Sequence, residues 1–442
     1  MNTAKKLALL GADILLLYGT LALTLLIRYG ASSLFESWAV HVGPFSLLFI
    51  LWLFVWYLAD LYRPSAFRTR ASLLSNLAIA TAVAALLSTV ALYLLSGIFE
   101  LTPKTNLVIF SVLFLLLDFL ARSMVSRKFA TGALSVAVIG SSSLIPETAA
   151  LLEKNPQIGY KITKIFATLS EQDLQDLKKQ IREKRIDLVV TQPTFPEGSP
   201  TLISLYKLLM LEIEILNLWD FYEGIFEKIP LDELNETWFI ENITTRRPFY
   251  DTAKRLVDMV ASSILIIIFI PFMILTGILV LCSSAGSIIF SQERIGKGGK
   301  SFTLYKFRSM ISDHNGSPWT EQRDARITPI GKILRYTHLD ELPQLFNIFK
   351  GELSLTGPRP ESAQLAEEFK AFPYYEIRHV IKPGLTGWAQ IHYRPSASLE
   401  EAREKLRYDM YYIKNRSLFI DLLIVLKTVR YFFMSFGNSN SI

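Results

Sequence analysis

The chain has 442 residues, of which 51% are hydrophobic, and a mean hydropathy of +0.32. This is high for a soluble protein and predicts a membrane protein with sizeable soluble parts and two or three domains. The single cysteine, Cys282, excludes disulfides within the chain and argues against a cysteine-based metal site. The net charge of +6 suits anionic lipid head groups. Because the basic residues flank apolar spans and do not form runs, we predict no nucleic-acid partner.

Four apolar segments occupy the first 130 residues, and we expect each to form a membrane helix. They cover Leu7 to Ile27, Pro44 to Leu61, Leu77 to Leu95 and Asn106 to Leu120. The first is long for a signal peptide and lacks an evident cleavage site, so we expect it to be retained. Asp13 inside it is costly in lipid, which predicts a neighbouring helix or an interfacial position and favours a packing role.

Basic residues mark one side of these four spans. They are Lys5 and Lys6 before the first span, Arg63, Arg68 and Arg70 after the second, and Arg122, Arg127 and Lys128 after the fourth. The other two loops contain few basic residues. The positive-inside rule therefore predicts that both ends of the bundle lie in the cytoplasm.

The next part of the chain alternates strands and helices. A buried strand, Val136 to Ile139, runs into a small-residue turn, and Ile186 to Thr191 forms a second strand after a charged helix. This alternation predicts a parallel sheet. A dinucleotide site would need G-x-G-x-x-G at the first turn, but Gly140 is followed by three serines, so a scaffold or oligomerisation module is favoured. The aromatic segment Trp219 to Asn242 is interpreted as a packed connector.

A longer apolar segment, Leu256 to Cys282, follows two basic pairs. Its length would permit a full membrane span, but Pro271 lies in its middle and would break the helical hydrogen-bond ladder. A second apolar segment, Leu418 to Phe433, is too short and too charged to span. A helix on the membrane surface and a soluble core helix both remain open for it.

The segment from Arg335 to Gly351 carries the strongest signal of a functional site. Leu342, Leu345, Phe346 and Phe349 have the spacing of one buried helix face, and Gly351 is a plausible helix end. Pro343 fits only the first turn of a helix, so we expect the helix to begin near Asp340. Asp340 and Glu341 would then lie at a helix N-terminus, where free amides favour anions. Alone, this pattern would also suit ordinary capping acids.

Five motifs occur in order around this acidic pair. They are Gln292-Glu293-Arg294-Ile295-Gly296, Lys306-Phe307-Arg308-Ser309-Met310, Leu339-Asp340-Glu341-Leu342-Pro343-Gln344, Gly357-Pro358-Arg359-Pro360 and Pro383-Gly384-Leu385-Thr386-Gly387-Trp388-Ala389-Gln390. Together they resemble the bacterial sugar transferase family, the monotopic polyprenyl-phosphate sugar-1-phosphate transferases, from about Lys254 to Arg430. The rest of the chain is similar to the larger members, which carry a four-helix membrane domain and a nucleotide-fold-like domain in front.

The resemblance implies a membrane protein that combines an α-helical bundle with α/β domains. The expected parts are a four-helix transmembrane domain at 1–130, a Rossmann-like α/β domain with its connector at 131–245, and a mixed α/β catalytic domain at 246–442. Residues 252–283 would form a re-entrant helix that bends at Pro271, where Ile270 replaces the serine usual in the family. This keeps the catalytic domain on the cytoplasmic side of a bacterial inner membrane. A homodimer is also expected.

The implied reaction moves a hexose-1-phosphate from a UDP-sugar to undecaprenyl phosphate and releases UMP, as the first membrane step of exopolysaccharide, capsule or O-antigen synthesis. The resemblance assigns Asp340 as the nucleophile and as a ligand of Mg²⁺, and Glu341 as the residue that manages protonation. Nothing in the sequence identifies the sugar.

Basic and turn residues complete the implied site. Arg335 corresponds to the arginine that meets the lipid phosphate, and Arg359 presents a planar fork between two prolines. Further expected phosphate contacts are Lys306, Arg308 and Arg294, the last equally suited to a structural ion pair. Expected pocket-shaping residues are Pro358, Pro360, Gly384, Thr386 and Gly387. Candidates to line a sugar pocket are His392, Tyr393 and Arg394.

Two other functions were weighed. A processive membrane glycosyltransferase needs separated acidic metal-binding motifs and more spans, which we do not find. A membrane-anchored scaffold that senses a nucleotide through the turn after Ile139 would predict erosion of the Asp340-Glu341 and Pro358-Arg359-Pro360 motifs, and both are intact.

Overall fold

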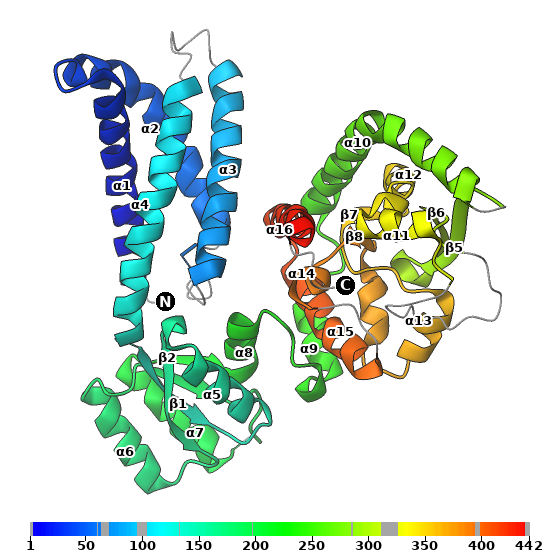
Figure 1. The fold of residues 1–442 in the computed structure, drawn as a ribbon. Coiled ribbons are helices and arrows are strands. Elements are labelled where there is room, and N and C mark those ends of the chain that lie inside the picture. Colours follow the sequence, from blue (N-terminus) through cyan, green and yellow to red (C-terminus); the bar gives the residue numbers. More distant parts are fainter. Residues whose placement is uncertain are drawn as a thin grey trace. The chain divides into compact units, whose positions relative to one another are not determined.

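The computed structural model describes residues 3–59, 61–62, 70–94, 104–131, 133–196, 198–283, 286–310, 326–393 and 398–437. The chain forms two compact units, Met1–Phe226 and Glu227–Ile442, whose elements are drawn in Figure 1. Each unit has its own apolar cores.

The first unit begins with four long helices that lie side by side (Figure 1). They are α1 (Thr3–Tyr29), α2 (Leu34–Leu58), α3 (Arg70–Leu94) and α4 (Lys104–Thr131). Each contains a stretch of 20 to 24 residues that is long and apolar enough to cross a membrane. Their shared core is aromatic: rings of Trp52, Trp56, Phe110 and Phe114 have centroids 5.1–5.7 Å apart. The four expected spans therefore correspond to helices, although α2 begins well before Pro44.

A buried charged cluster joins two of these helices. Arg122 in α4 donates to Asp13 Oδ2 at 2.7 Å, to Asp118 Oδ1 at 2.8 Å and to the Leu61 carbonyl at 2.9 Å. The Tyr62 hydroxyl donates to Asp13 at 2.7 Å. The three charged side chains are at most 5% exposed. Asp13 is thus compensated by a neighbouring helix, which confirms the packing role predicted for it.

A fully parallel four-stranded sheet follows, with strand order β2-β1-β3-β4. Its strands are β1 (Leu134–Ile139), β2 (Tyr160–Phe166), β3 (Leu188–Thr191) and β4 (Glu214–Asn217), and its helices are α5 (Leu144–Lys154), α6 (Glu171–Arg182), α7 (Pro200–Leu208) and α8 (Leu218–Phe226). Alternate residues of the strands point to opposite faces. Val136 and Val138 pack in one apolar cluster, while Ala137 and Ile139 pack in the other. The predicted parallel α/β arrangement is present, and its Rossmann-like character stays a prediction.

The turn after β1 is filled by a side chain from the turn after β3. Gly140 has φ +132°, and a Cβ there would come within 2.6 Å of Gln192. The Ser141 amide donates to Gln192 Oε1 at 3.1 Å. A glutamine therefore occupies the space that a dinucleotide phosphate would need in a fold of this kind.

The predicted aromatic connector is divided between the two units. In α8, Phe221 and Tyr222 pack on the parallel sheet. From Glu227 onward the chain packs within the second unit: Trp238 and Phe239 of α9 (Glu236–Asn242) are buried, and the Phe239 ring lies 4.3 Å from that of Tyr374. The boundary between compact units thus falls between Phe226 and Glu227.

The second unit surrounds two small sheets with helices. Strands β5 (Ile289–Ile295) and β6 (Ser301–Phe307) form an antiparallel hairpin, and β7 (Ser354–Thr356) pairs in parallel with β8 (Gly384–Thr386). The helices are α10 (Pro248–Ser283), α11 (Pro329–Tyr336), α12 (Gln344–Lys350), α13 (Ala363–Phe369), α14 (Trp388–His392), α15 (Leu399–Asn415) and α16 (Leu418–Gly437). The described residues of both units also include short 3-10 segments at Pro156–Ile158, Leu209–Leu211, Leu231–Glu233, Lys297–Gly299, Leu339–Glu341 and Tyr375–Val380.

Helix α10 changes direction along its length (Figure 1). Pro271 lies inside it and removes one backbone hydrogen bond, which is a physical cause for a bend. Near its start, Asp258 accepts a hydrogen bond from the Leu355 amide at 3.0 Å, and Arg255 donates to the Ile348 carbonyl at 2.8 Å. These bonds anchor the polar end of the helix. Only 22% of its most apolar stretch is buried, so the helix leaves exposed an apolar surface of the kind that a membrane covers.

Helix α16 combines the two alternatives left open for it. One face is docked: Asp421 accepts hydrogen bonds from Tyr412 at 2.5 Å and Tyr250 at 2.8 Å, and it pairs with Lys254 at 3.0 Å. Another part of its surface is apolar and exposed, including Leu422. The helix is therefore packed on α10 and α15 and still presents an apolar surface.

Candidate active site

Asp340 does not begin an α-helix, contrary to the prediction. Leu339–Glu341 form a 3-10 turn and α12 starts only at Gln344. The amides of Glu341 and Leu342 donate to the carbonyls of His338 and Leu339 at 3.1 and 3.3 Å. Pro343 has no amide with which to continue an α-helical ladder, so the turn closes more tightly. The two amides that follow Asp340 are thus already hydrogen-bonded and not free for an anion.

The predicted buried face of α12 is partly wrong. Leu345 is buried, but Phe346 and Phe349 are 43% and 47% exposed. The buried face instead includes Asn347, whose side chain donates to the Thr303 carbonyl at 2.7 Å and accepts from the Tyr305 amide at 3.2 Å. An apolar pattern does not identify an asparagine as buried when its partners lie on a distant strand. The predicted helix end at Gly351 is confirmed, with φ +90°.

Glu341 brings together two of the predicted phosphate-binding residues. Its Oε1 accepts from Lys306 Nζ in β6 at 2.9 Å and from Arg359 Nη2 at 2.8 Å. Burial alone would raise the pKa of Glu341, but the Arg359 and Lys306 charges hold it well below its usual range. Glu341 is therefore ionised at neutral pH. A role in proton handling requires that substrate phosphates first draw Lys306 and Arg359 away from it.

Asp340 lies beside this ionic cluster. The residue is 7% exposed, and burial raises the pKa of its carboxyl, while Lys306 opposes the rise. Within the described ranges, its carboxylate has no hydrogen bond or ion pair, so its oxygens are available for a phosphorus atom or a cation. The described residues contain no group of three or more metal-ligating side chains. A carboxylate oxygen still fits Mg²⁺, which takes few protein ligands and completes its shell with water and phosphate.

Arg294 makes structural hydrogen bonds, whereas the structural alternative expected for it was an ion pair, and its part in phosphate binding stays a prediction. Its guanidinium donates to the Pro360 carbonyl at 3.0 Å and to Gln292 Oε1 at 2.6 Å. These bonds hold the loop that carries Arg359. Burial lowers the pKa of Arg294, and the nearby positive charge of Arg359 lowers it further, while Glu361 opposes the shift.

The other two predicted phosphate contacts have different surroundings. Arg335 in α11 donates to Ser309 Oγ at 3.1 Å, and with Lys306 it counteracts the rise in the pKa of Asp340 that burial causes. Arg308 follows β6, and its guanidinium lies against Gly286. The structure thus places Arg335 near Asp340 and packs Arg308 against a backbone segment.

The predicted pocket-shaping glycines bring two motifs into backbone contact. The Gly357 amide donates to the Thr386 carbonyl and the Gly384 amide to the Pro358 carbonyl, each at 2.9 Å. A Cβ on Gly384 would lie 2.0 Å from the Gly357 nitrogen, and one on Gly387 would lie 2.3 Å from the Gly357 oxygen. No side chain fits between these strands, so both glycines are required for the loop geometry that presents Arg359.

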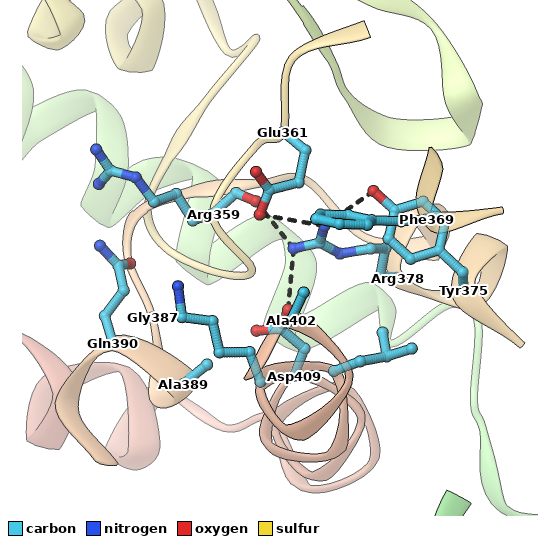
Figure 2. Close-up of a pocket in the computed structure, with 12 residues that line it drawn as sticks. Arg359, Glu361, Phe369, Tyr375, Arg378, Gly387, Ala389, Gln390, Ala402 and Asp409 are labelled. Atoms are coloured by element: carbon cyan, nitrogen blue, oxygen red, sulfur yellow. Dashed lines mark hydrogen bonds and ion pairs between the residues drawn. The ribbon is translucent and has the colours of Figure 1, made fainter. Parts of the chain in front are cut away.

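Sequence reasoning missed a charged pocket next to this loop, which we call the Gln390 pocket (Figure 2). Its polar lining is Arg359, Glu361, Arg378, Gln390, Lys405 and Asp409. Arg378 donates to Asp409 at 2.9 Å, to the Tyr375 hydroxyl at 3.1 Å and to the Arg359 carbonyl at 2.9 Å. These residues come from separate elements, so no local spacing could have revealed the pocket.

The role predicted for three residues in lining a sugar pocket stays a prediction. The His392 ring stacks on Tyr408 with centroids 5.7 Å apart, and neither His392 nor Tyr393 is in the lining of the Gln390 pocket. Arg394 is outside the described residues. Trp388 is 3% exposed and stacks on Tyr411, so it packs in the interior of the second unit.

Comparison with known proteins identifies the family of the second unit. A sequence model described as bacterial sugar transferase matches residues 249–435. The exopolysaccharide production protein PSS of Rhizobium leguminosarum bv. phaseoli is 38% identical over 187 residues, which cover 40% of this chain and 92% of that protein. The chain belongs to the bacterial sugar transferase family.

Two longer members of this family carry names that specify a sugar. The UDP-N-acetylgalactosamine-undecaprenyl-phosphate N-acetylgalactosaminephosphotransferase of Aeromonas hydrophila is 38% identical over 231 residues, 52% of this chain and 54% of that protein. The UDP-glucose:undecaprenyl-phosphate glucose-1-phosphate transferase of Klebsiella pneumoniae is 39% identical over 181 residues, 40% of this chain and 39% of that protein. The chain thus matches about half or less of the length of these relatives.

In this family member, Arg359→Lys is expected to lower kcat/KM for the transfer proposed below by about tenfold or more. Lysine keeps the charge but lacks the planar guanidinium, which can donate to Glu341 and to a phosphate at the same time. The change therefore removes at least one charge-assisted hydrogen bond, which is worth about 1.5–3 kcal/mol. Arg403→Lys, an exposed change on α15, is the matched control and should behave as the unchanged protein. Unchanged rates in Arg359→Lys would remove Arg359 from the site.

Proposed function

We propose that this protein transfers a hexose-1-phosphate from a UDP-sugar to undecaprenyl phosphate and releases UMP, through a phosphosugar covalently bound to Asp340. This is the first membrane step of exopolysaccharide, capsule or O-antigen synthesis. The observation that supports it most is the buried Asp340 carboxylate, free of ion pairs among the described residues, beside Lys306 and Arg359 held by Glu341.

The chemistry divides between these residues. An Asp340 oxygen attacks the phosphorus that bears the sugar, and the bond from that phosphorus to the bridging oxygen breaks as UMP leaves. A phosphate oxygen of the lipid then attacks the same phosphorus and frees Asp340. Lys306 and Arg359 balance the charge of the diphosphate, which relieves Glu341 of its two partners. Asp340 would also hold Mg²⁺, which supplies further charge neutralisation on the diphosphate.

The test is the identity of the released nucleotide. Purified protein with undecaprenyl phosphate, Mg²⁺ and each of UDP-glucose, UDP-galactose, UDP-N-acetylglucosamine and UDP-N-acetylgalactosamine should release UMP from at least one donor. Chelation of Mg²⁺ should stop the release. Release of UDP would instead support a glycosyltransferase that builds a polymer, and no nucleotide release would support a scaffold. The names of the relatives differ in the sugar, so the panel must include all four donors.

We also propose an inner-membrane topology in which α1–α4 span the bilayer, α10 is re-entrant, and the second unit lies in the cytoplasm. Its support is the basic-residue asymmetry, the bend of α10 and the polar anchoring of its first turns. On a Cys282→Ser background, Lys300→Cys should react with a thiol reagent only when the cytoplasmic face is accessible. Labelling of Lys300→Cys from the periplasm would contradict a re-entrant α10.

A further inference from the structure

The Gln390 pocket begins at Arg359, and the empty space beside its lining residues, open solvent included, is about 430 Å³. Figure 2 shows the Arg359 guanidinium and the Gln390 amide on one side of the pocket, and Arg378, Asp409 and Tyr375 grouped away from them. Because Arg359 is bonded to Glu341 at 2.8 Å, the pocket and the Asp340-Glu341 pair share one arginine.

On one side of the pocket, the polar side chains bond mainly to one another. Arg378 and Asp409 are 7% and 4% exposed and bond to each other. Arg378 also donates to the Tyr375 hydroxyl and the Arg359 carbonyl, while its Nε has no hydrogen-bond partner among the described residues. The Tyr375 ring packs edge-on against Phe369 with centroids 5.7 Å apart. Their bonds to one another hold the shape of this side of the pocket.

The other side has polar groups that lack partners. Gln390 Oε1 is buried and accepts no hydrogen bond from the described residues. Lys405 in α15 has no hydrogen bond or ion pair within those residues, and burial lowers the pKa of its ammonium, although Glu361 opposes this. A ligand in this cavity could therefore bond to both the Gln390 oxygen and the Lys405 ammonium.

The chemistry of these groups suits a polyol ring. Each hydroxyl of a pyranose both donates and accepts, so an amide oxygen, an ammonium and the half-buried Glu361 carboxylate can each bond to one. Ala389 and Leu406 in the lining offer apolar surface to ring carbons. A uracil would need a free aromatic face, and the pocket's two rings, Phe369 and Tyr375, already pack against each other.

We propose that the Gln390 pocket binds the sugar ring of the UDP-sugar, and that Lys405 and Gln390 bond to its hydroxyls. This rests on the proposed function, since a diphosphate at Arg359 places the attached sugar beside the pocket. Lys405, Gln390 and Glu361 are then the residues that discriminate between sugars, because a site built to bond hydroxyls rejects a ring that presents them differently.

The experiment compares donor and nucleotide affinity in Lys405→Met and Gln390→Met, which keep side-chain length and remove the polar group. Calorimetry on an Asp340→Asn background measures the Kd of the best of the four UDP-sugars and of UMP. We expect the donor Kd to rise about tenfold or more in each variant and the UMP Kd to stay within about twofold. Lys300→Met, exposed in the β5–β6 turn, is the matched control and should change neither value. Thermal unfolding checks that each variant is folded, and either one that folds suffices for the test.

Three results would overturn the proposal. The first is an unchanged donor Kd in a folded variant, and the second is the absence of donor binding to the Asp340→Asn protein. The third is an equal rise in the Kd of donor and UMP, which would place the nucleotide in the pocket. The proposed function is tested separately by UMP release from the protein without substitutions. If donor binding depends on Lys405 but the protein without substitutions releases no UMP, the proposed sugar pocket stands and the proposed reaction is wrong.

Discussion

Asp340→Asn is expected to reduce UMP release by at least about 10³-fold and to abolish covalent labelling of the protein. The protein without this change, given Mg²⁺ and a UDP-sugar but no lipid, should release up to about one equivalent of UMP per active site and retain a phosphosugar. A neutral amide is a poor nucleophile and a poor Mg²⁺ ligand. Nucleotide chromatography measures the first effect, and intact mass with peptide mapping measures the second.

Two controls separate covalent catalysis from simple metal binding. Hydroxylamine should remove the label, because acyl phosphates react with it. Glu341→Gln should slow turnover and still permit labelling, because Glu341 holds Lys306 and Arg359 but does not attack phosphorus. If UMP appears only when polyprenyl phosphate is present and no label is found on Asp340, the lipid phosphate attacks directly and the two-step mechanism is wrong.

Arg122→Met is expected to destabilise the four-helix bundle by about 3–5 kcal/mol, a large fraction of the roughly 5–15 kcal/mol that stabilises a typical domain. The change leaves the Asp13 and Asp118 carboxylates buried without the guanidinium that bonds to both. It also removes the donor to the Leu61 carbonyl. Membrane-fraction yield and thermal unfolding in detergent measure the effect.

The matched control for Arg122→Met removes the whole charged cluster. Arg122→Met combined with Asp13→Asn and Asp118→Asn leaves no uncompensated charge, so it should recover much of the lost stability. Arg182→Met, an exposed change at the end of α6, should have no measurable effect. Equal yields and melting temperatures for Arg122→Met and the unchanged protein would show that the cluster is not a structural requirement.

Features that depend on neighbouring residues were predictable from the sequence. Long apolar runs predicted the four helices of the first unit, because the length and composition that suit a membrane are local properties. The end of α12 at Gly351 was predictable because only a glycine adopts φ +90° without strain. The parallel sheet followed from the alternation of strands and helices. The motifs around Asp340 were recognisable for the same reason: each is a short, continuous string.

Contacts between distant residues were decided only by the tertiary structure. Glu341 bonds to Lys306, 35 positions away, and to Arg359, 18 positions away, and no spacing rule selects those two cations from the basic residues nearby. Arg294 bonds to the Pro360 carbonyl, 66 positions away, a contact that its local sequence does not indicate. The Gln390 pocket joins residues from separate elements whose charges had no local meaning. Backbone preferences act within a few residues, whereas charge compensation and cavity shape depend on which elements pack together, and the sequence does not state that directly.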